Sequence, residues 1–323
     1  MEFGLQLAGL EWTELRDAAQ EAEGLGYQSL FVPDHLVAEG PERQVEPDYL
    51  SYDPMIEIAV VAEATKTVRV GHLVLCNLFR HPMVTAQSLT SLDRLSGGRL
   101  LAGLGTGWTE REFRMSGIAF PDIGVRVQML DEALTCLRSL WTQEAATFTG
   151  AHYRLSEAVL RPRPVQQPHP PILLGGGGKG LLRLAAKHAT FINIISEAGK
   201  PGYIKLANVA KLTDDSFKAK VQFVRDEASR FGRDGQSVRI STVIFSAILT
   251  DSPHATRAVA ENMAPLFNTT PEGMLHSPLA LIGTPEQCIA ELQRRRREWE
   301  VSQVIFSRRA PIRRLAEEVL PHV

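Results

Sequence analysis

The sequence predicts an α/β fold, a (β/α)8 barrel of the TIM type, formed as a single domain by residues 1–323. Short apolar runs alternate strictly with helical segments of ten or more residues, which is typical of a parallel sheet covered by helices. We count eight such strand segments, and barrels of this class routinely reach this length as one unit. A doubly wound sheet, the alternative, would need Gly-x-Gly-x-x-Gly after its first strand, where this sequence has Ala8-Gly9-Leu10-Glu11.

The first part of the barrel is predicted over residues 1–104. Its strands are expected at residues 3–8, 29–32, 68–75 and 99–104. One helix covers residues 12–25, and a second begins at Pro54 with Asp53 as its N-cap. The buried face of that second helix is expected to contain Ile56, Ala59, Val60, Glu63 and Ala64. A third helix begins at Pro82 and ends at Gly97 and Gly98 in a left-handed C-cap. Its buried face is expected to contain Ala86, Leu89, Leu92 and Leu95.

The second part of the barrel is predicted over residues 125–323. Its strands are expected at residues 172–174, 191–195, 238–249 and 301–306. Its helices are expected at residues 125–141, 181–188, 213–231, 284–299 and 310–320. The polar, proline-rich stretch of residues 143–170 is predicted to be an insertion that contains a hairpin and a loop.

Composition and charge argue against several classes of protein. With 44% hydrophobic and 22% charged residues, the chain has the ordinary balance of a soluble protein. Its formal net charge of −2 provides no basic field for nucleic acid. The three cysteines are too few and too widely spaced for a metal site, and they favour a reducing compartment. The sequence shows no signal peptide and no apolar segment long enough to span a bilayer, so we expect a cytoplasmic protein without membrane association.

Several predicted strands end in residues that are suited to chemistry, and the active site of a (β/α)8 barrel lies at these carboxyl ends. The second strand ends at Asp34 and His35, a carboxylate next to an imidazole that can exchange a proton near pH 7. The structural alternative is that Asp34 caps a turn while His35 packs as a half-buried ring. After the third strand, Cys76 has apolar neighbours, which favours a packed core position over a reactive thiol.

The fourth predicted strand ends in small residues. Gly105, Thr106 and Gly107 would let a planar ligand approach the backbone closely, and the Thr106 hydroxyl and nearby amides would bond its polar edge. The alternative is an ordinary helix and strand joined by a glycine turn. Trp108 suits core packing, ligand contact or both.

The fifth predicted strand is followed by a run of glycines at the start of a helix. Gly175, Gly176, Gly177 and Gly178 offer successive backbone amides, and Lys179 adds a positive charge. Amides in this arrangement at a helix N-terminus form an anion site. This run is the strongest phosphate signal in the chain, and a glycine-rich hinge is its alternative.

Residues 80–108 carry a resemblance to a known family. They contain, in order, Arg-His-Pro, Leu-Asp-x-Leu-Ser-Gly-Gly-Arg and Gly-x-Gly-x-Gly-Trp. This order resembles the luciferase-like flavin and deazaflavin oxidoreductases, and the likeness spans nearly the whole chain. The resemblance implies the same barrel, with the phosphate of the cofactor bound by residues 175–179.

The resemblance also implies roles for individual residues. Asp34 and His35 would lie beside the reactive ring of the cofactor, with Thr106 near it. In the deazaflavin branch a cis peptide falls at Leu73 and Val74, where the backbone supports the ring.

Two departures from the family accompany these matches. In the sugar-phosphate dehydrogenases of the deazaflavin branch, a glutamate takes the place of Trp108, which argues against their activity here. The usual Ala-Asp-Gly before the sixth strand is Ala189-Thr190-Phe191 here, so the contact made by that strand is expected to differ.

We therefore predict an oxidoreductase that transfers a hydride between the deazaflavin coenzyme F420 and a small organic substrate. The expected reaction is reduction of an activated C=C, C=N or C=O, with His35 as the acid. An FMN-dependent monooxygenase of the same superfamily is the first alternative, and a barrel that only binds a cofactor is the second. Members of the family are often dimers, so we expect a homodimer. Insertions at residues 36–52, 116–125 and 143–170 are expected to roof the pocket.

Charged residues outside these strand ends receive structural interpretations. Residues 294–297 are four arginines that are predicted to form a solvated helix face, because neighbouring glutamates offset their charge. The arginines after the last strand are expected to begin a surface helix, with an acidic cofactor tail or substrate as the alternative partner. They are Arg308, Arg309, Arg313 and Arg314. Glu112 is interpreted as a structural residue.

Overall fold

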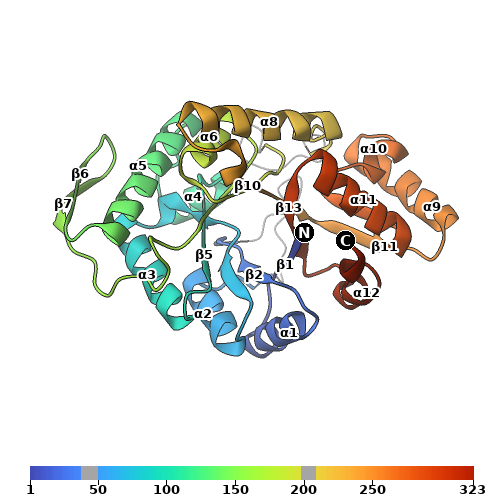
Figure 1. Ribbon diagram of the computed structural model, residues 1–323, viewed down its shortest axis with the longest axis horizontal. Helices are drawn as coiled ribbons and strands as arrows, with labels where there is room; N and C mark the ends of the chain where they lie inside the picture. The colour runs from blue at the N-terminus through green and yellow to red at the C-terminus, as the bar shows by residue number, and fades with distance from the viewer. Residues whose placement is uncertain (38–49, 198–208) are drawn as a thin grey trace.

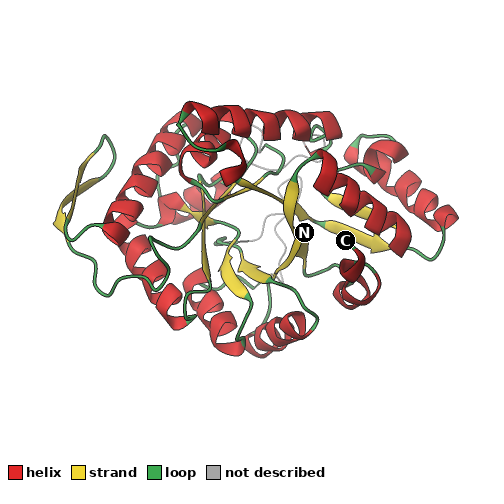
Figure 2. Cartoon of the chain, in the orientation of Figure 1, coloured by secondary structure: helices red, strands yellow, loops and turns green. Residues whose placement is uncertain are grey.

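The computed structural model describes residues 1–37, 50–197 and 209–323, and its strands form a closed parallel barrel surrounded by helices (Figures 1 and 2). The strand order is β3-β2-β1-β13-β10-β9-β8-β5-β4, and pairing of β3 with β5 closes the ring. Because β3 and β4 pair with the same neighbour, β5, they share one strand position in the ring. The barrel therefore has eight strand positions. The predicted (β/α)8 barrel is confirmed. The barrel strands are β1 (Glu2–Gln6), β2 (Ser29–Val32), β3 (Arg69–His72), β4 (Leu75–Cys76), β5 (Leu100–Gly105), β8 (Ile172–Gly175), β9 (Phe191–Asn193), β10 (Arg239–Ile244) and β13 (Val301–Ser307).

The interior of the barrel is filled by side chains rather than open. Phe31, Leu101, Leu173, Phe191 and Ile305, from five different strands, form a buried apolar cluster. Leu73 and Val74 pack against this cluster and also line the cavity described below. The cluster therefore supports the floor of the site. A second and larger core lies between the strands and the surrounding helices.

Helices follow the strands in the predicted order. They are α1 (Trp12–Gly24), α2 (Pro54–Ala64), α3 (Pro82–Leu95), α4 (Glu110–Ser116), α5 (Ile123–Thr142), α6 (Lys179–His188), α8 (Asp214–Arg230), α9 (Pro253–Met263), α10 (Pro271–Leu275), α11 (Pro285–Glu298) and α12 (Ile312–Glu318), with short 3-10 turns at Asn77–Phe79, Gly235–Ser237, Ala264–Phe267 and Leu320–His322. Asp53 accepts a hydrogen bond from the Met55 amide as the predicted N-cap of α2. Gly97 and Gly98 have positive φ, as the predicted C-cap requires.

Two predicted helix faces were wrong in part. Helix α2 buries Ile58, Val61 and Ala62, whereas Ile56 is 58% exposed. This helix is apolar on nearly every side, so its sequence does not define which side faces the barrel. In α3 the predicted face is buried except for Leu95, which is 46% exposed in the last turn.

The predicted strand over residues 238–249 is two strands in two sheets. After β10 the chain leaves the barrel at Phe245, and β11 (Ser246–Leu249) pairs in parallel with β12 (Ala280–Gly283). Helices α9 and α10 pack beside this pair, on the right of Figure 1. The sequence analysis assigned no structure to residues 250–283, so this small unit is new. The continuous apolar run conceals the break because both strands are apolar.

The insertion at residues 143–170 forms the predicted hairpin, from β6 (Ala146–Thr149) and β7 (Arg154–Ala158). The hairpin projects from the outside of the barrel, on the left of Figure 1, and no residue of the insertion lines the cavity. The expectation that it roofs the pocket was wrong. Residues 120–124, within the second insertion, do line the cavity. Most of the remaining insertion, residues 36–52, lies outside the described residues.

The expected solvated face at residues 294–297 was also wrong in part. The Arg295 side chain is fully buried, and that of Arg294 is 19% exposed. All three cysteines are free and buried. Among the helices that the structure describes, none is long and apolar enough to cross a membrane.

Candidate active site

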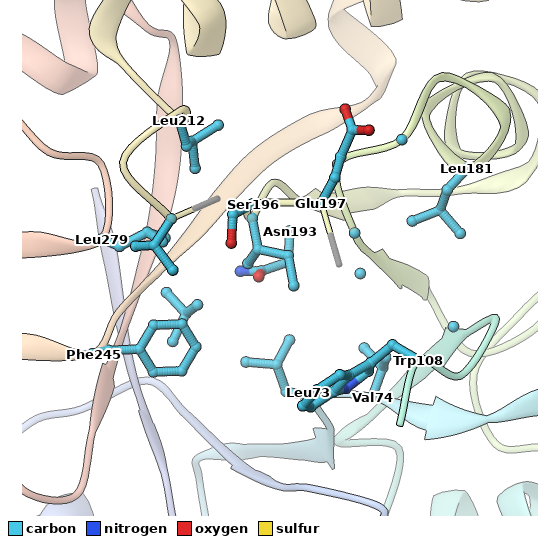
Figure 3. A pocket seen from close by; sticks show the side chains of 18 of the residues that line it. Leu73, Val74, Trp108, Leu181, Asn193, Ser196, Glu197, Leu212, Phe245 and Leu279 are labelled. Atoms are coloured by element: carbon cyan, nitrogen blue, oxygen red, sulfur yellow. The ribbon is translucent and has the colours of Figure 1, made fainter. Parts of the chain in front are cut away.

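A cavity of about 1840 Å³ opens at the carboxyl ends of the barrel strands, as Figure 3 shows. Every site residue predicted from the sequence lines it. They are Asp34, His35, Leu73, Val74, Gly105, Thr106, Gly107, Gly175, Gly176, Gly177, Gly178 and Lys179. These residues come from four strand ends that are far apart in the sequence but adjacent in the barrel, which is why the fold brings them to one place.

Asp34 is a buried carboxylate whose oxygens are both engaged. Its Oδ2 accepts hydrogen bonds from Nη1 of Arg80 at 2.7 Å and from the amide of Cys76 at 2.9 Å, and its Oδ1 accepts one from Nη2 of Arg80 at 3.3 Å. Burial raises the pKa of Asp34, and the Arg80 guanidinium opposes that shift. Asp34 therefore joins the end of β2 to the end of β4 and to Arg80. The sequence analysis used Arg80 only as part of a family motif and missed this partnership.

His35 is held by a second buried carboxylate, Glu112 of α4. The Nδ1 atom of His35 lies 3.2 Å from each oxygen of Glu112, whose side chain is 3% exposed. Glu112 also accepts the Leu36 amide at 2.5 Å. The His35 ring lies edge-on to Trp108, with centroids 5.5 Å apart. With Nδ1 engaged, Nε2 is the ring nitrogen available to a ligand. The structural interpretation of Glu112 was thus incomplete, because it orients the imidazole.

The predicted cis peptide between Leu73 and Val74 is present and separates β3 from β4. The Leu73 carbonyl accepts a hydrogen bond from Nε2 of Gln6 at 3.1 Å. The Val74 side chain is wedged between two glycines, because a Cβ at Gly105 would lie 2.7 Å from Val74 Cγ2 and one at Gly175 would lie 2.9 Å from Cγ1. These two glycines are therefore required by the packing of Val74.

The loop after β5 also depends on a close approach. Gly107 has a φ of +72°, and a Cβ there would lie 2.7 Å from the Cys76 sulfur. The Gly107 carbonyl accepts a hydrogen bond from Arg126, whose guanidinium lies 4.0 Å above the Phe120 ring. Burial raises the pKa of Cys76 to about 12, so its thiol is neutral at physiological pH, in agreement with the predicted packed position.

The glycine run after β8 forms a cradle at the N-terminus of α6. A Cβ at Gly177 would lie 2.1 Å from the Ile195 carbonyl oxygen, and Gly176 has a φ of +150°. Gly178 is the N-cap of α6, no side chain caps this end, and a Cβ at Gly178 would meet nothing within 4 Å. An uncapped helix start with open space in front of it suits a phosphate, since the first amides lack partners within the helix.

The sequence of this chain is similar to those of known proteins. The model of the luciferase-like monooxygenase family matches residues 2–273. A protein from Amycolatopsis mediterranei named F420-dependent glucose-6-phosphate dehydrogenase is 27% identical over 294 residues, which cover 87% of this chain and 84% of the relative. A protein of the same name from Intrasporangium calvum is 32% identical over 193 residues, which cover 59% of this chain and only 56% of the relative.

Among solved structures, a secondary alcohol dehydrogenase described as F420-dependent, in complex with an F420-acetone adduct, superposes with a TM-score of 0.76. The two chains are 20% identical, and the superposition covers 100% of this chain and 98% of that one. At this level of identity the likeness shows a shared fold.

Proposed function

Because the chain belongs to the luciferase-like monooxygenase family, we propose that it is an oxidoreductase that exchanges a hydride between coenzyme F420 and a small organic substrate. The observation that carries the proposal is that one cavity contains both an uncapped helix start and the His35–Glu112 pair. The names of the two relatives support F420 as the cofactor.

The residues around the cavity suit a cofactor of this shape. The phosphate would be held by the amides of Gly177 and Gly178 and by the start of α6, with Lys179 adding positive charge. The Gly176 amide instead donates to the Asn193 carbonyl at 3.0 Å. The ring would rest on the backbone of Leu73 and Val74, with the Thr106 hydroxyl at its polar edge. When bound in its reduced form, the deazaflavin supplies a hydride, and in its oxidised form it accepts one.

His35 would handle the proton that must accompany the hydride. Reduction of a C=C, C=N or C=O bond adds a hydride to one atom and a proton to the other, and Nε2 of a protonated His35 can donate that proton. Glu112 stabilises the protonated ring at Nδ1 and fixes its orientation. In the oxidative direction, neutral Nε2 accepts the proton of an alcohol. Asp34, which is engaged by Arg80, would hold the neighbouring backbone in place.

An FMN-dependent monooxygenase is the second candidate, because the matching family is named for monooxygenase activity and the same cradle suits the phosphate of FMN. The two candidates are distinguished by measuring oxygen consumption with an oxygen electrode after the protein is mixed with each reduced cofactor in aerated buffer. We expect reduced F420 to be retained without oxygen consumption. Protein-dependent oxygen uptake with reduced FMN would favour the monooxygenase. The intact His35–Glu112 pair argues against a barrel that only carries a cofactor.

We also propose a homodimer in the cytoplasm. Ile56 of α2 and Val84 of α3 are 58% and 51% exposed on two helices that pack together, and they offer apolar surface for self-association. The free, buried cysteines suit a reducing compartment. Light scattering after size-exclusion chromatography tests the dimer, and an Ile56→Asp variant would shift a real dimer of this kind toward the monomer.

A further inference from the structure

One half of the cavity is not used by the predicted cofactor residues. Among the described residues, it is lined by residues within 193–197 and 209–214, by the end of β10 with Phe245, and by residues within 267–279 of the small unit. Leu212, Phe245 and Leu279 gather on one side of the cavity in Figure 3, away from Leu181 and Glu197. We call these three residues the apolar wall.

We propose that the apolar wall binds the substrate and selects a neutral, apolar carbonyl compound over a sugar phosphate. The inference rests on the proposed function and names its substrate class. Phe245 supplies the first argument, since it stands between β10 and β11 and is 49% exposed in the cavity. Leu212 and Leu279 also line the cavity but are only 3% and 4% exposed, so Phe245 provides most of the accessible apolar surface of the wall. A ligand that covers the Phe245 ring removes apolar area from water, which favours an apolar ligand.

The charges near the apolar wall supply the second argument. Asp214 is paired with the Arg294 guanidinium at 2.6 Å and with the Lys218 ammonium at 2.9 Å, and it accepts a hydrogen bond from the Trp299 ring nitrogen at 2.8 Å. These two cations are therefore already engaged. Asp214 and Glu272 both line this half of the cavity. A phosphate group placed against the apolar wall would lose its hydration without gaining a free cation from Arg294 or Lys218, which costs free energy. Of the described arginines that line the cavity, Arg126 lies on α5, and Arg308 and Arg309 follow β13, the strand beside β10.

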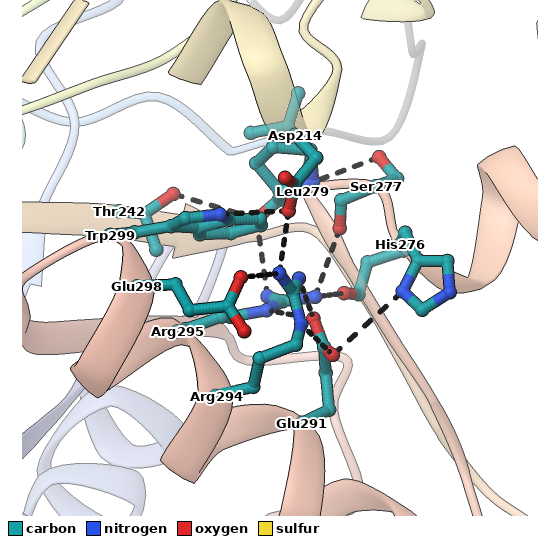
Figure 4. A network of polar contacts seen from close by, with 12 residues as sticks. Asp214, Thr242, His276, Ser277, Leu279, Glu291, Arg294, Arg295, Glu298 and Trp299 are labelled. Atoms are coloured by element: carbon teal, nitrogen blue, oxygen red, sulfur yellow. Dashed lines mark hydrogen bonds and ion pairs between the residues drawn. The ribbon is translucent and has the colours of Figure 1, made fainter. Parts of the chain in front are cut away.

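Within the apolar wall, the backbone around Leu279 is held by the buried Arg295, whose contacts Figure 4 shows. Arg295 of α11 is fully buried and donates hydrogen bonds to the carbonyls of Ser277 at 3.0 Å and Ala280 at 2.6 Å, on either side of Leu279. Its Nε also donates to Glu291 at 2.8 Å. These contacts hold the backbone around Leu279, whose carbonyl accepts the Phe245 amide at 3.0 Å. This part of the wall is therefore preformed, and a preformed surface loses less entropy when a ligand binds.

This assignment separates the chain from its named relatives. Two of them carry the name glucose-6-phosphate dehydrogenase. Here the cavity has Trp108 next to His35 and an apolar wall with acidic neighbours. The chemistry of this half therefore suits an uncharged molecule with a hydrocarbon body.

Calorimetric titration of the full chain without coenzyme tests the inference. The probes are cyclohex-2-en-1-one, carvone (the same ring with added methyl and isopropenyl groups) and glucose 6-phosphate. Since each buried methylene is worth about four-fold in affinity, carvone is expected to bind at least about ten-fold more tightly than cyclohex-2-en-1-one. Glucose 6-phosphate is expected to bind more weakly than either. Tighter binding of glucose 6-phosphate than of carvone would overturn the proposal.

Two variants locate the binding to the apolar wall. Phe245→Ala should weaken carvone binding about ten-fold, because it removes most of the exposed ring from the wall. Phe231→Ala is the matched control, since Phe231 is 41% exposed at the end of α8 and does not line the cavity. Equal carvone affinity in Phe245→Ala and the unmodified chain would also overturn the proposal. Because no coenzyme is present, these results stand apart from the separate titration with F420.

Discussion

Replacement of Gly178 by aspartate tests the phosphate cradle with little risk to the fold. Gly178 has φ −76° and ψ 145°, which any residue adopts, and a Cβ there meets nothing within 4 Å. An aspartate at an N-cap accepts a hydrogen bond from the first turn and interacts favourably with the helix dipole. We therefore expect Gly178→Asp to keep or raise the thermal midpoint, with a gain of about 0.5 kcal/mol.

The same substitution should abolish tight binding of the coenzyme. The new carboxylate would take the amides that the phosphate needs and would place a negative charge beside it. Two unit charges about 5 Å apart at an effective dielectric of about 20 repel by about 3 kcal/mol, which corresponds to more than 100-fold in Kd. Gly178→Ser, which caps the helix without a charge, should weaken binding less.

Fluorescence titration of F420 against each variant measures this effect, together with a thermal melt that confirms folding. Ser252→Asp is the matched control, because Ser252 caps α9 and does not line the cavity. It should leave the Kd for F420 unchanged. If Gly178→Asp melts normally and still binds F420 within about two-fold of the unmodified chain, the phosphate does not lie at the start of α6, and the argument from uncapped amides is wrong.

Three further predictions concern single contacts. Glu112→Gln should lower kcat by about 5- to 30-fold with little change in the Kd for F420, because a charge-assisted hydrogen bond to His35 becomes a neutral one. Burial raises the pKa of Glu57 from its ordinary value of 4.5 to about 7. Above pH 7 the native protein must therefore bury an ionised carboxylate at this position, which lowers its stability. Glu57→Gln should therefore be more stable than the unmodified chain at pH 8, by about 2 kcal/mol in urea unfolding, and equal to it near pH 4.5. Gly103→Ala should lower the free energy of unfolding by about 3 kcal/mol or more, because its Cβ would lie 1.7 Å from the His72 carbonyl oxygen.

Each of these predictions has a result that would contradict it. An additional loss of turnover from Glu112→Gln in a His35→Ala background would show that Glu112 does not act through the imidazole. A stability gain from Glu57→Gln that is the same at pH 4.5 and pH 8 would exclude the proposed protonation. Gly24→Ala is the control for Gly103→Ala, since a Cβ at Gly24 meets nothing within 4 Å. Similar urea midpoints for these two variants would show that β5 adapts to the clash.

The barrel could be predicted because its signal is local. Strands buried on both faces appear as short continuous apolar runs, and the helices between them show their own period. The same property explains the error at residues 238–249, where two apolar strands of different sheets follow each other directly. Nothing within that run marks Phe245 as the point where the chain leaves the barrel, because the partner of β11 comes more than thirty residues later, at Ala280.

Side-chain roles that depend on distant partners were harder to predict. Gly178 could be assigned to a phosphate cradle because the unpaired amides at a helix start form an anion site without any residue that is distant in the sequence. Arg295 was predicted to lie in solvent because its neighbours in the sequence are charged. It is buried instead, and the carbonyls of Ser277 and Ala280 accept hydrogen bonds from its guanidinium. Glu112 lies 77 residues from His35 in the chain, so only the fold reveals that pair.

The central claim is that this cavity binds a deazaflavin coenzyme, and direct titration of the purified chain with F420 and with FMN tests it most simply. Fluorescence of each oxidised cofactor is followed as protein is added. The proposed function predicts saturable binding of F420 with a micromolar or lower Kd, with FMN at least about ten-fold weaker, a difference of about 1.4 kcal/mol. Absence of F420 binding by the folded chain, or tighter binding of FMN, would contradict it.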